Sequence, residues 1–185
     1  MPIKPENVKS AADAKKIVEE RGLTHVKVAV FDGDGIMRGK YMSKAKFFSA
    51  LENGFGFCDV VLGWDSHDQL FDNVKYTGWH TAYPDAWVRL VPSTCRDLPM
   101  EGNMLLFLGE FTDKAEAICP RGTLRRVLDK AAKMGYEAYS ALEFEYFMFD
   151  ETPESVREKN YKNLQPMTPR LFCYSVIRNP VWSEL

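Results

Sequence analysis

The sequence predicts an α+β protein, in which short helices and strands follow one another along 185 residues. Helix-start signals, Ser10 as a cap and Pro120 in a first turn, open two amphipathic stretches, and runs of β-branched or aromatic residues lie between these stretches. The composition is 45% hydrophobic and 27% charged with a net charge of −2, which is typical of a globular protein. A chain of this length can bury a core in one large domain or two small ones.

The first elements are a helix, a hairpin and a second helix. A helix is expected from Ser10 to Arg21, because Ser10 can cap its start and Gly22 can end it. Residues 26–31 and 36–42 are short strands on either side of a glycine-rich turn, so we expect them to pair. Residues 43–53 then show the apolar spacing of a helix.

The turn of the hairpin reads Asp32-Gly33-Asp34-Gly35. We expect its two aspartates to accept hydrogen bonds from nearby backbone amides, as Asx side chains do in tight turns. The alternative is a calcium loop, but such a loop needs more oxygen ligands and the longer EF-hand pattern. The turn interpretation is therefore preferred.

Residues 54–85 show no sustained period of two or 3.6 residues and are rich in Gly, Asp, His and aromatic side chains. A long irregular stretch in a compact region is usually functional or disordered, and the aromatic content favours order. We therefore expect an ordered functional loop. Trp64 and Trp79 within it are expected to be core residues.

Two strands and a helix follow. Strands are expected at residues 87–91 and 104–111, and a polar link at 113–117. The helix opens at Pro120 and ends at Gly135, with an apolar stripe on one side. Its other side carries arginines that could bind phosphate, but a solvated helix face is the preferred interpretation; they are Arg121, Arg125 and Arg126.

A new domain is expected to start after this link, giving domains of residues 1–115 and 116–185. Helix followed by strand across a glycine is the repeating unit of an α/β layer or barrel. Residues 151–168 are charged and are expected to be an exposed excursion, and residues 171–177 a further strand. One helix and two strands are too few to enclose a core, so we expect a fragment or closure against another chain.

The most informative segment is the aromatic run at residues 141–149, which predicts a strand. Glu143 and Glu145 then share one strand face, about 7 Å apart. Such a pair favours a divalent cation between them, although two solvated glutamates on a wet sheet face would give the same spacing. An acid–base pair of a glycosidase is a third, less favoured, interpretation because both groups lie on one strand face.

Several classes of protein are disfavoured. Charge is balanced and no block of like charges suggests nucleic acid or an anionic membrane as partner. No signal peptide or membrane span is evident. The four cysteines are scattered without a CxxC pair, and the three histidines lack ligand spacing, which argues against zinc and fits a reducing cytoplasm.

Three segments together resemble the glutamine synthetase family. They are Asp32-Gly33-Asp34-Gly35-Ile36-Met37-Arg38-Gly39-Lys40, Tyr83-Pro84-Asp85-Ala86-Trp87-Val88-Arg89, and the block from Pro120-Arg121 through Glu143-Phe144-Glu145-Tyr146-Phe147. The resemblance is nearer to the branch of γ-glutamyl-amide and γ-glutamylpolyamine synthetases. It implies a β-grasp-like N-terminal domain, followed by the first helix and strands of the α/β catalytic domain.

The resemblance also implies a reaction and its metal ligands. In the family, the γ-phosphate of ATP passes to the side-chain carboxylate of glutamate, and ammonia or a primary amine then displaces phosphate. Glu143 and Glu145 correspond to glutamates that hold Mg²⁺ or Mn²⁺ near the ATP phosphates and the substrate, which suits the chemistry of phosphoryl transfer.

An ammonium-site aspartate is implied in the irregular loop, where Asp65 is the best positional match and Asp59 its rival. The loop departs from the family's F-D-G-S-S pattern, which leaves the amine open. Family members form rings in which one subunit completes the site of the next, so a homo-oligomer is expected of the parent. This chain alone is expected to be inactive, and a non-catalytic scaffold of the same family is the alternative.

Overall fold

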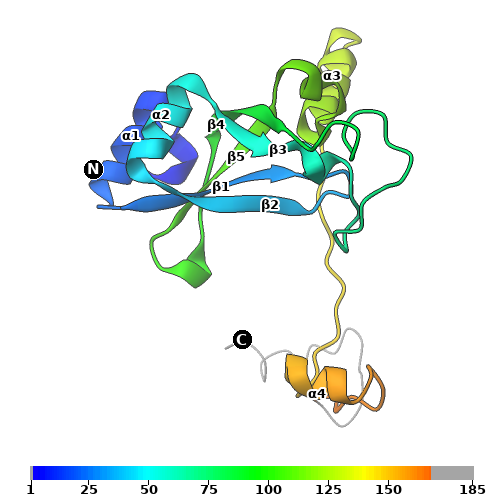
Figure 1. Cartoon of the computed structure of the whole chain (residues 1–185). Helices are drawn as coiled ribbons and strands as arrows, with labels where there is room; N and C mark the ends of the chain where they lie inside the picture. Colours follow the sequence, from blue (N-terminus) through cyan, green and yellow to red (C-terminus); the bar gives the residue numbers. More distant parts are fainter. Residues whose placement is uncertain (1, 168–185) are drawn as a thin grey trace. The chain divides into compact units, whose positions relative to one another are not determined.

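The structure is a computed structural model that describes residues 2–167. The chain divides into two compact units, Met1–Ala138 and Tyr139–Leu185. The first unit contains a five-stranded sheet with helices against it (Figure 1). The mixed helix and strand content confirms the predicted α+β class.

The first unit holds all five strands and three of the α-helices found within residues 2–167. Its helices are α1 (Ala11–Glu20), α2 (Lys44–Asn53) and α3 (Pro120–Lys133). Its strands are β1 (His25–Phe31), β2 (Met37–Ser43), β3 (Phe55–Cys58), β4 (Asp85–Asp97) and β5 (Leu105–Phe111). Four 3₁₀ turns complete it: η1 (Pro5–Asn7), η2 (Asp59–Leu62), η3 (Pro99–Glu101) and η4 (Asp113–Ile118).

The strands form one mixed sheet in the order β2-β1-β5-β4-β3. β1 and β2 pair antiparallel from His25↔Ser43 to Phe31↔Met37, which confirms the predicted hairpin. β1 runs parallel to β5, and the β5–β4 and β4–β3 pairs are antiparallel. A parallel pair at the centre therefore joins the N-terminal hairpin to the later strands.

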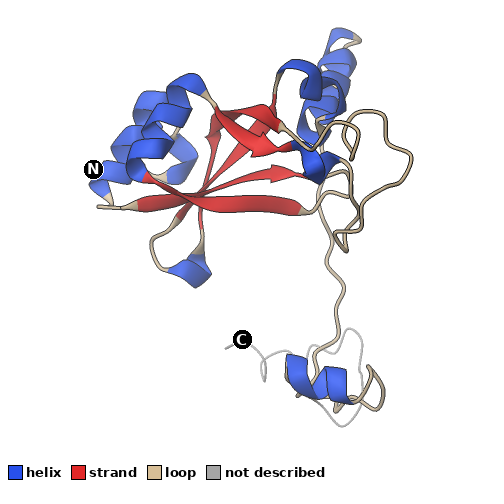
Figure 2. Ribbon diagram, in the orientation of Figure 1, coloured by secondary structure: helices blue, strands red, loops and turns tan. Residues whose placement is uncertain are grey.

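The core lies between the sheet and the two N-terminal helices, α1 and α2, which cover one face of the sheet (Figure 2). Val26, Val28 and Val30 alternate along β1 and are fully buried on that face. Phe47 of α2 belongs to the same buried cluster, and its ring centroid lies 4.6 Å from that of Phe107 on β5. Burial of these apolar side chains is the main force that holds the helices on the sheet.

Helix α1 begins where the sequence predicts. The Ser10 hydroxyl accepts a hydrogen bond from the Asp13 amide at 3.1 Å, and the Asp13 carboxylate accepts one from the Ser10 amide at 2.9 Å. This reciprocal capping box satisfies two amides that the first turn leaves without partners. Ser43 similarly accepts a bond from the Lys46 amide at the start of α2.

Strand β3 lies inside the stretch predicted to be wholly irregular. Phe55 and Phe57 alternate with small residues and point into the core, and β3 pairs with the start of β4. β4 also extends beyond the predicted residues 87–91, past an irregularity between Val91 and Arg96. The period-two pattern of β3 was too short to stand out beside its glycine and cysteine neighbours.

The second unit differs from its prediction. Residues 136–148 carry no regular secondary structure, so the strand expected at 141–149 is not present, and only an isolated bridge joins Phe149 to Pro166. A strand is held by a ladder of backbone hydrogen bonds to its neighbours. Within the described residues, the only such bond to residues 141–149 is near their end, where the Met167 amide donates to the Met148 carbonyl. Helix α4 (Pro153–Glu158) lies in the predicted excursion, capped by Thr152. The strand expected at 171–177 lies outside the described residues.

Replacing Phe107 by Ala is expected to lower the free energy of unfolding by about 3–5 kcal/mol, because the ring is fully buried and leaves a cavity against Phe47. Denaturant unfolding followed by tryptophan fluorescence measures the change. Phe71→Ala is the matched control, since that ring is 43% exposed and its loss should cost less than about 1 kcal/mol. Equal effects of the two substitutions would contradict the described core.

Candidate functional site

Asp65 sits at the head of a tight loop formed by residues 65–69. Its Oδ1 accepts hydrogen bonds from the amides of His67 at 2.8 Å and Gln69 at 3.0 Å, and its own amide donates to the Gln69 carbonyl. These backbone donors, that of Gln69 first, lower the pKa of the Asp65 carboxyl below its ordinary value of 3.8. The group is therefore a fixed anion, partly exposed to solvent.

Asp59 lies in a different environment at the start of η2. Only 3% of the residue is exposed, and its Oδ1 accepts a hydrogen bond from the Thr77 hydroxyl at 2.5 Å. Burial raises the pKa of the Asp59 carboxyl, and the hydrogen bond from Thr77 opposes this rise. Of the two rival aspartates, Asp65 is the more accessible and Asp59 is built into the interior.

The turn between β1 and β2 confirms the Asx interpretation of its first aspartate. Asp32 is fully buried, and its Oδ1 accepts from the amides of Asp34 at 3.1 Å and Ile36 at 2.8 Å. Its Oδ2 pairs with Arg38 Nε at 2.7 Å. The buried carboxylate is thus held by two backbone donors and one guanidinium, which compensate for its loss of water.

Glu143 and Glu145 both have exposed side chains, in the segment without regular structure. Carboxylate oxygens are suitable ligands for Mg²⁺ or Mn²⁺, but two of them do not complete a coordination shell. Among the described residues there is no group of three or more His, Cys, Asp or Glu side chains that could hold a metal ion. The donor set therefore fits part of a metal site, and the role of both glutamates stays a prediction.

The two tryptophans of the irregular loop differ in burial. Trp64 is partly buried and packs against the core cluster, as predicted, with the Arg38 guanidinium 4.9 Å above its ring. Trp79 is 83% exposed, so the prediction that it belongs to the core was wrong. Its ring makes an edge contact with Tyr83 instead, at 5.4 Å between centroids. Sequence alone does not show which loop aromatic faces inward.

The arginine face of α3 is not simply solvated, which corrects the prediction. Arg121 Nε lies 3.6 Å and Arg125 Nε 3.5 Å from the carboxylate of Glu110, whose side chain is only 5% exposed. Arg89 on β4 pairs with the same carboxylate at 2.5 Å. Arg126 donates to the carbonyls of η4. The charged side of α3 therefore docks on β5 and η4.

The apolar stripe of α3 faces outward in consequence. Leu124 is 58% and Val127 59% exposed. An exposed stripe of this kind on a helix normally marks a surface that packs against further protein.

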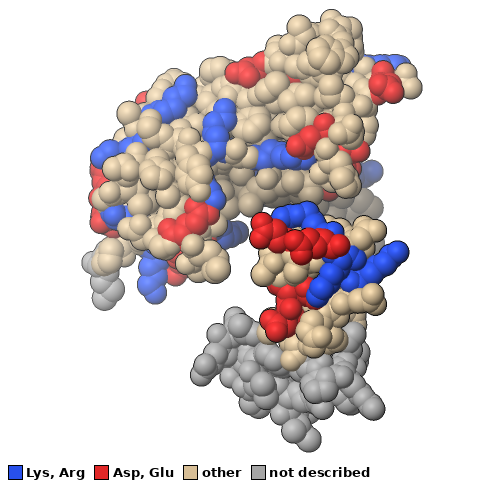
Figure 3. Space-filling model, turned by 60° about the horizontal axis from the view of Figure 1, so that its bottom comes forward, with Lys and Arg blue, Asp and Glu red and all other residues tan. Residues whose placement is uncertain are grey.

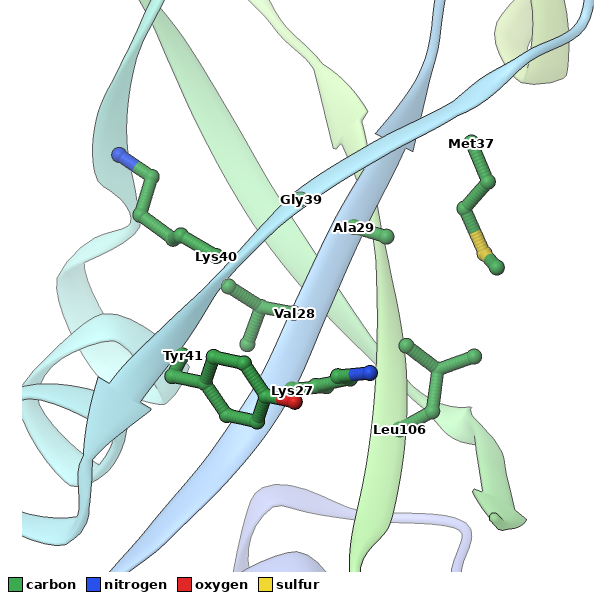
Figure 4. A pocket seen from close by; sticks show the side chains of 8 residues that line it. All are labelled: Lys27, Val28, Ala29, Met37, Gly39, Lys40, Tyr41 and Leu106. Carbon is green, nitrogen blue, oxygen red and sulfur yellow. The ribbon is translucent and has the colours of Figure 1, made fainter. Parts of the chain in front are cut away.

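A pocket lies against strands β1, β2 and β5 (Figure 4). Lys27 Nζ lies 4.9 Å from the centre of the Tyr41 ring, and the Tyr41 hydroxyl donates to Glu101 at 2.8 Å. Lys27 also pairs with Glu101. The pocket is lined by Lys27, Val28, Ala29, Met37, Gly39, Lys40, Tyr41 and Leu106, and it includes neither rival aspartate.

Acidic and basic side chains are interspersed over the face shown in Figure 3. Within residues 2–167, no helix is long and apolar enough to cross a membrane.

The described residues thus comprise a unit built on a five-stranded sheet and a following unit that carries the paired glutamates. Residues 117–177 match the family model described as "Glutamine synthetase, catalytic domain", a range that includes Glu143 and Glu145. This match and the curated relatives confirm the resemblance to the glutamine synthetase family that the three motifs predicted.

Curated relatives carry the names of both glutamine and γ-glutamyl-amide synthetases. The type-1 glutamine synthetase 2 of Dictyostelium discoideum is 43% identical over 86% of this chain and 31% of its own length. The γ-glutamylethanolamide synthetase GlnA4 of Streptomyces coelicolor is 31% identical over 82% of this chain and 34% of its own. The glutamate–isopropylamine ligase of a Pseudomonas species is 27% identical over 97% and 40%. The chain thus spans about a third of the length of these relatives.

Solved structures support the same fold. A GmaS/ADP complex superimposes with a TM-score of 0.50 at 18% identity, covering 66% of this chain and 26% of that one. The glutamine synthetase of Plasmodium falciparum, solved by cryo-electron microscopy, gives a TM-score of 0.50 at 15% identity, covering 73% and 24%. The predicted fold class is therefore confirmed.

The pH dependence of unfolding should distinguish the two aspartates. A carboxyl with a lowered folded pKa stabilises the fold above its unfolded pKa, and the contribution is lost as pH falls through the folded value. Asp65→Asn should therefore lower stability at neutral pH, and its difference from wild type should shrink below pH 3.8.

Asp59→Asn should show the opposite trend, because the folded pKa is raised and ionisation above 3.8 opposes folding of the wild type. The substituted protein should therefore gain stability relative to wild type as pH rises. Urea unfolding at a series of pH values measures both differences. Parallel pH profiles for the two variants would contradict the described environments.

Proposed function

We propose that this chain is part of an ATP-dependent carboxylate–amine ligase of the glutamine synthetase type. The supporting observation is the match of residues 117–177 to the family's catalytic domain, because it spans the paired glutamates. The substrates are then glutamate, ATP and either ammonia or a primary amine. The names of the relatives, which include an ethanolamide synthetase and an isopropylamine ligase, support the wider amine class.

In this proposal Glu143 and Glu145 contribute two of the oxygen ligands of Mg²⁺ or Mn²⁺. A bound divalent ion supplies charge neutralisation for transfer of the γ-phosphate to the glutamate side chain. This chain presents two carboxylates on an exposed segment, where other groups can complete the coordination of the same ion. Further ligands must come from outside the described residues, since no three-membered cluster of suitable side chains lies within them.

Asp65 is proposed to attract the ammonium form of the amine and to accept its proton before attack. A neutral amine is the nucleophile, so an anion beside it serves both steps. The lowered pKa keeps Asp65 charged, and it favours attraction of the cation over uptake of the proton. Asp59 remains the alternative, since its raised pKa suits a proton acceptor better while its burial hinders access.

We further propose that the 185-residue chain alone is inactive and that the active form is a cytoplasmic homo-oligomeric ring. The chain spans 31% of its Dictyostelium relative, which supports the need for more protein. The predicted boundary between domains 1–115 and 116–185 belongs to this proposal, supported by a family match that begins at residue 117. The exposed apolar side chains of α3, Leu124 and Val127, support the proposal that further protein packs against this helix.

A manganese titration tests the metal ligands directly. The whole chain is expected to bind Mn²⁺ weakly, and the E143Q/E145Q double variant to lose that binding, as followed by the electron paramagnetic resonance of free Mn²⁺. The control is E154Q/E158Q, which makes the same change of charge on two exposed glutamates of α4. Equal loss in both double variants would show only non-specific attraction.

A chimera tests the reaction. This chain replaces the matching third of the Dictyostelium relative, and ADP release is measured with glutamate, Mg²⁺ and either ammonia, ethanolamine or isopropylamine. Amide synthesis is expected in the chimera and not in the chain alone, and E143Q or E145Q should abolish it. A chimera that assembles but does not turn over, beside an active relative, would favour the scaffold alternative.

A further inference from the structure

The β1–β2 turn and the loop that carries Asp65 lie at the same end of the sheet and are joined by polar contacts (Figure 1). The guanidinium of Arg38, on β2, connects them. On one side its Nε pairs with the buried Asp32 at 2.7 Å. On the other side its Nη1 pairs with Asp68 at 2.6 Å, and its Nη2 donates to the Asp65 carbonyl at 3.4 Å.

Two more contacts strengthen this connection. The guanidinium Cζ of Arg38 lies over the ring of Trp64, the residue before Asp65, at 4.9 Å from the ring centroid. The amide of Ser66, the residue after it, donates to Asp34 Oδ2 of the turn at 2.8 Å. Asp65 is therefore held at its own carbonyl and on both sides along the chain.

The chemistry of Arg38 suits this role. Its side chain is only 18% exposed, and the hydrogen bonds that it donates, to Asp32 first and then to Asp68, raise its pKa, so that it stays charged. A planar guanidinium can bind two carboxylates and a carbonyl in different directions while it stacks on an indole. A lysine ammonium at the same place lacks that fork of donors.

We propose that Arg38, anchored on Asp32, is a positioning residue that fixes the Asp65 carboxylate in place. This rests on the proposed function only for what Asp65 does. The mechanical part stands on the contacts of Arg38 alone. Because Asp65 Oδ1 caps the amides of His67 and Gln69, protection of these two amides reports directly whether the carboxylate stays in position.

Hydrogen exchange in the whole chain, read by NMR, tests the proposal. R38M is expected to speed exchange at the His67 and Gln69 amides by about 10- to 100-fold, the range for losing charge-assisted hydrogen bonds. R38K is expected to behave like R38M, because it restores the charge and not the fork. Amides of β1 should keep their wild-type rates.

R21M is the matched control. Arg21 pairs with Asp97 at 2.6 Å and also donates to the Asn103 carbonyl, and its side chain is 22% exposed. It is therefore an ion-paired arginine of similar burial, in contact with neither the turn nor the Asp65 loop. R21M should leave the two reporter amides unchanged. A rise in R21M equal to that in R38M would overturn the proposal, because it would reflect general loosening.

Asp68→Asn keeps the test decisive if R38M does not fold. Asp68 is on the loop and its side chain is 57% exposed, so this change leaves the buried pair of Asp32 and Arg38 intact. Exchange at the two reporter amides should rise, by less than in a folded R38M. Rates within about twofold of wild type in D68N, or full protection in R38K, would refute the positioning role.

The chimera separates this proposal from the proposed function. R38M should raise the KM for the amine in the same direction as D65N, with the KM for ATP unchanged. If D65N leaves the amine KM unchanged while R38M speeds exchange, the role of Asp65 fails and the positioning role stands. If D65N raises the amine KM but R38M changes neither exchange nor KM, the positioning role fails.

Discussion

The parallel pairing of β1 with β5 is the constraint on which the rest of the first unit depends. Lys27, Val28 and Ala29 pair with residues 106–108, which lie far along the sequence. Because β1 also carries the hairpin on its other edge, this one ladder joins the N-terminal hairpin to the half of the sheet made by β3, β4 and β5. The apolar face that results is what α1 and α2 cover.

Polar contacts position the segments outside the apolar core, namely the β1–β2 turn and the loop of Asp65. Buried Asp32 is satisfied within its own turn and by Arg38, and Arg38 carries the connection on to the loop of Asp65. A buried carboxylate without these donors would be costly, and a loop without them would depend on its few aromatic contacts for order. The same residues therefore stabilise the hairpin and place the candidate anion.

A second buried carboxylate, Glu110, lies near the end of β5, and β5 runs parallel to β1. Arginines from β4 and from α3 converge on Glu110, so α3 is held on the sheet by charge as well as by backbone continuity. This arrangement turns the apolar stripe of α3 outward. It also explains why a face that looks solvated in the sequence is occupied in the structure.

Local signals in the sequence determined much of this protein. The caps at Ser10 and Ser43, the hairpin around Asp32 and the start of α3 at Pro120 all follow from residues that act on their immediate neighbours. The motif that contains the paired glutamates also indicated the glutamine synthetase family, because the order of residues in a motif can be recognised without knowing their surroundings in the fold.

Only the tertiary structure decided which partners those elements meet. It placed Phe55 in a strand, turned Trp79 outward, gave Glu110 its arginines and left the segment of Glu143 without strand neighbours among the described residues. Each of these outcomes depends on contacts between residues distant in the chain. A periodicity or propensity along the sequence describes only one of the two segments that make such a contact. The free energy of the contact depends on both segments.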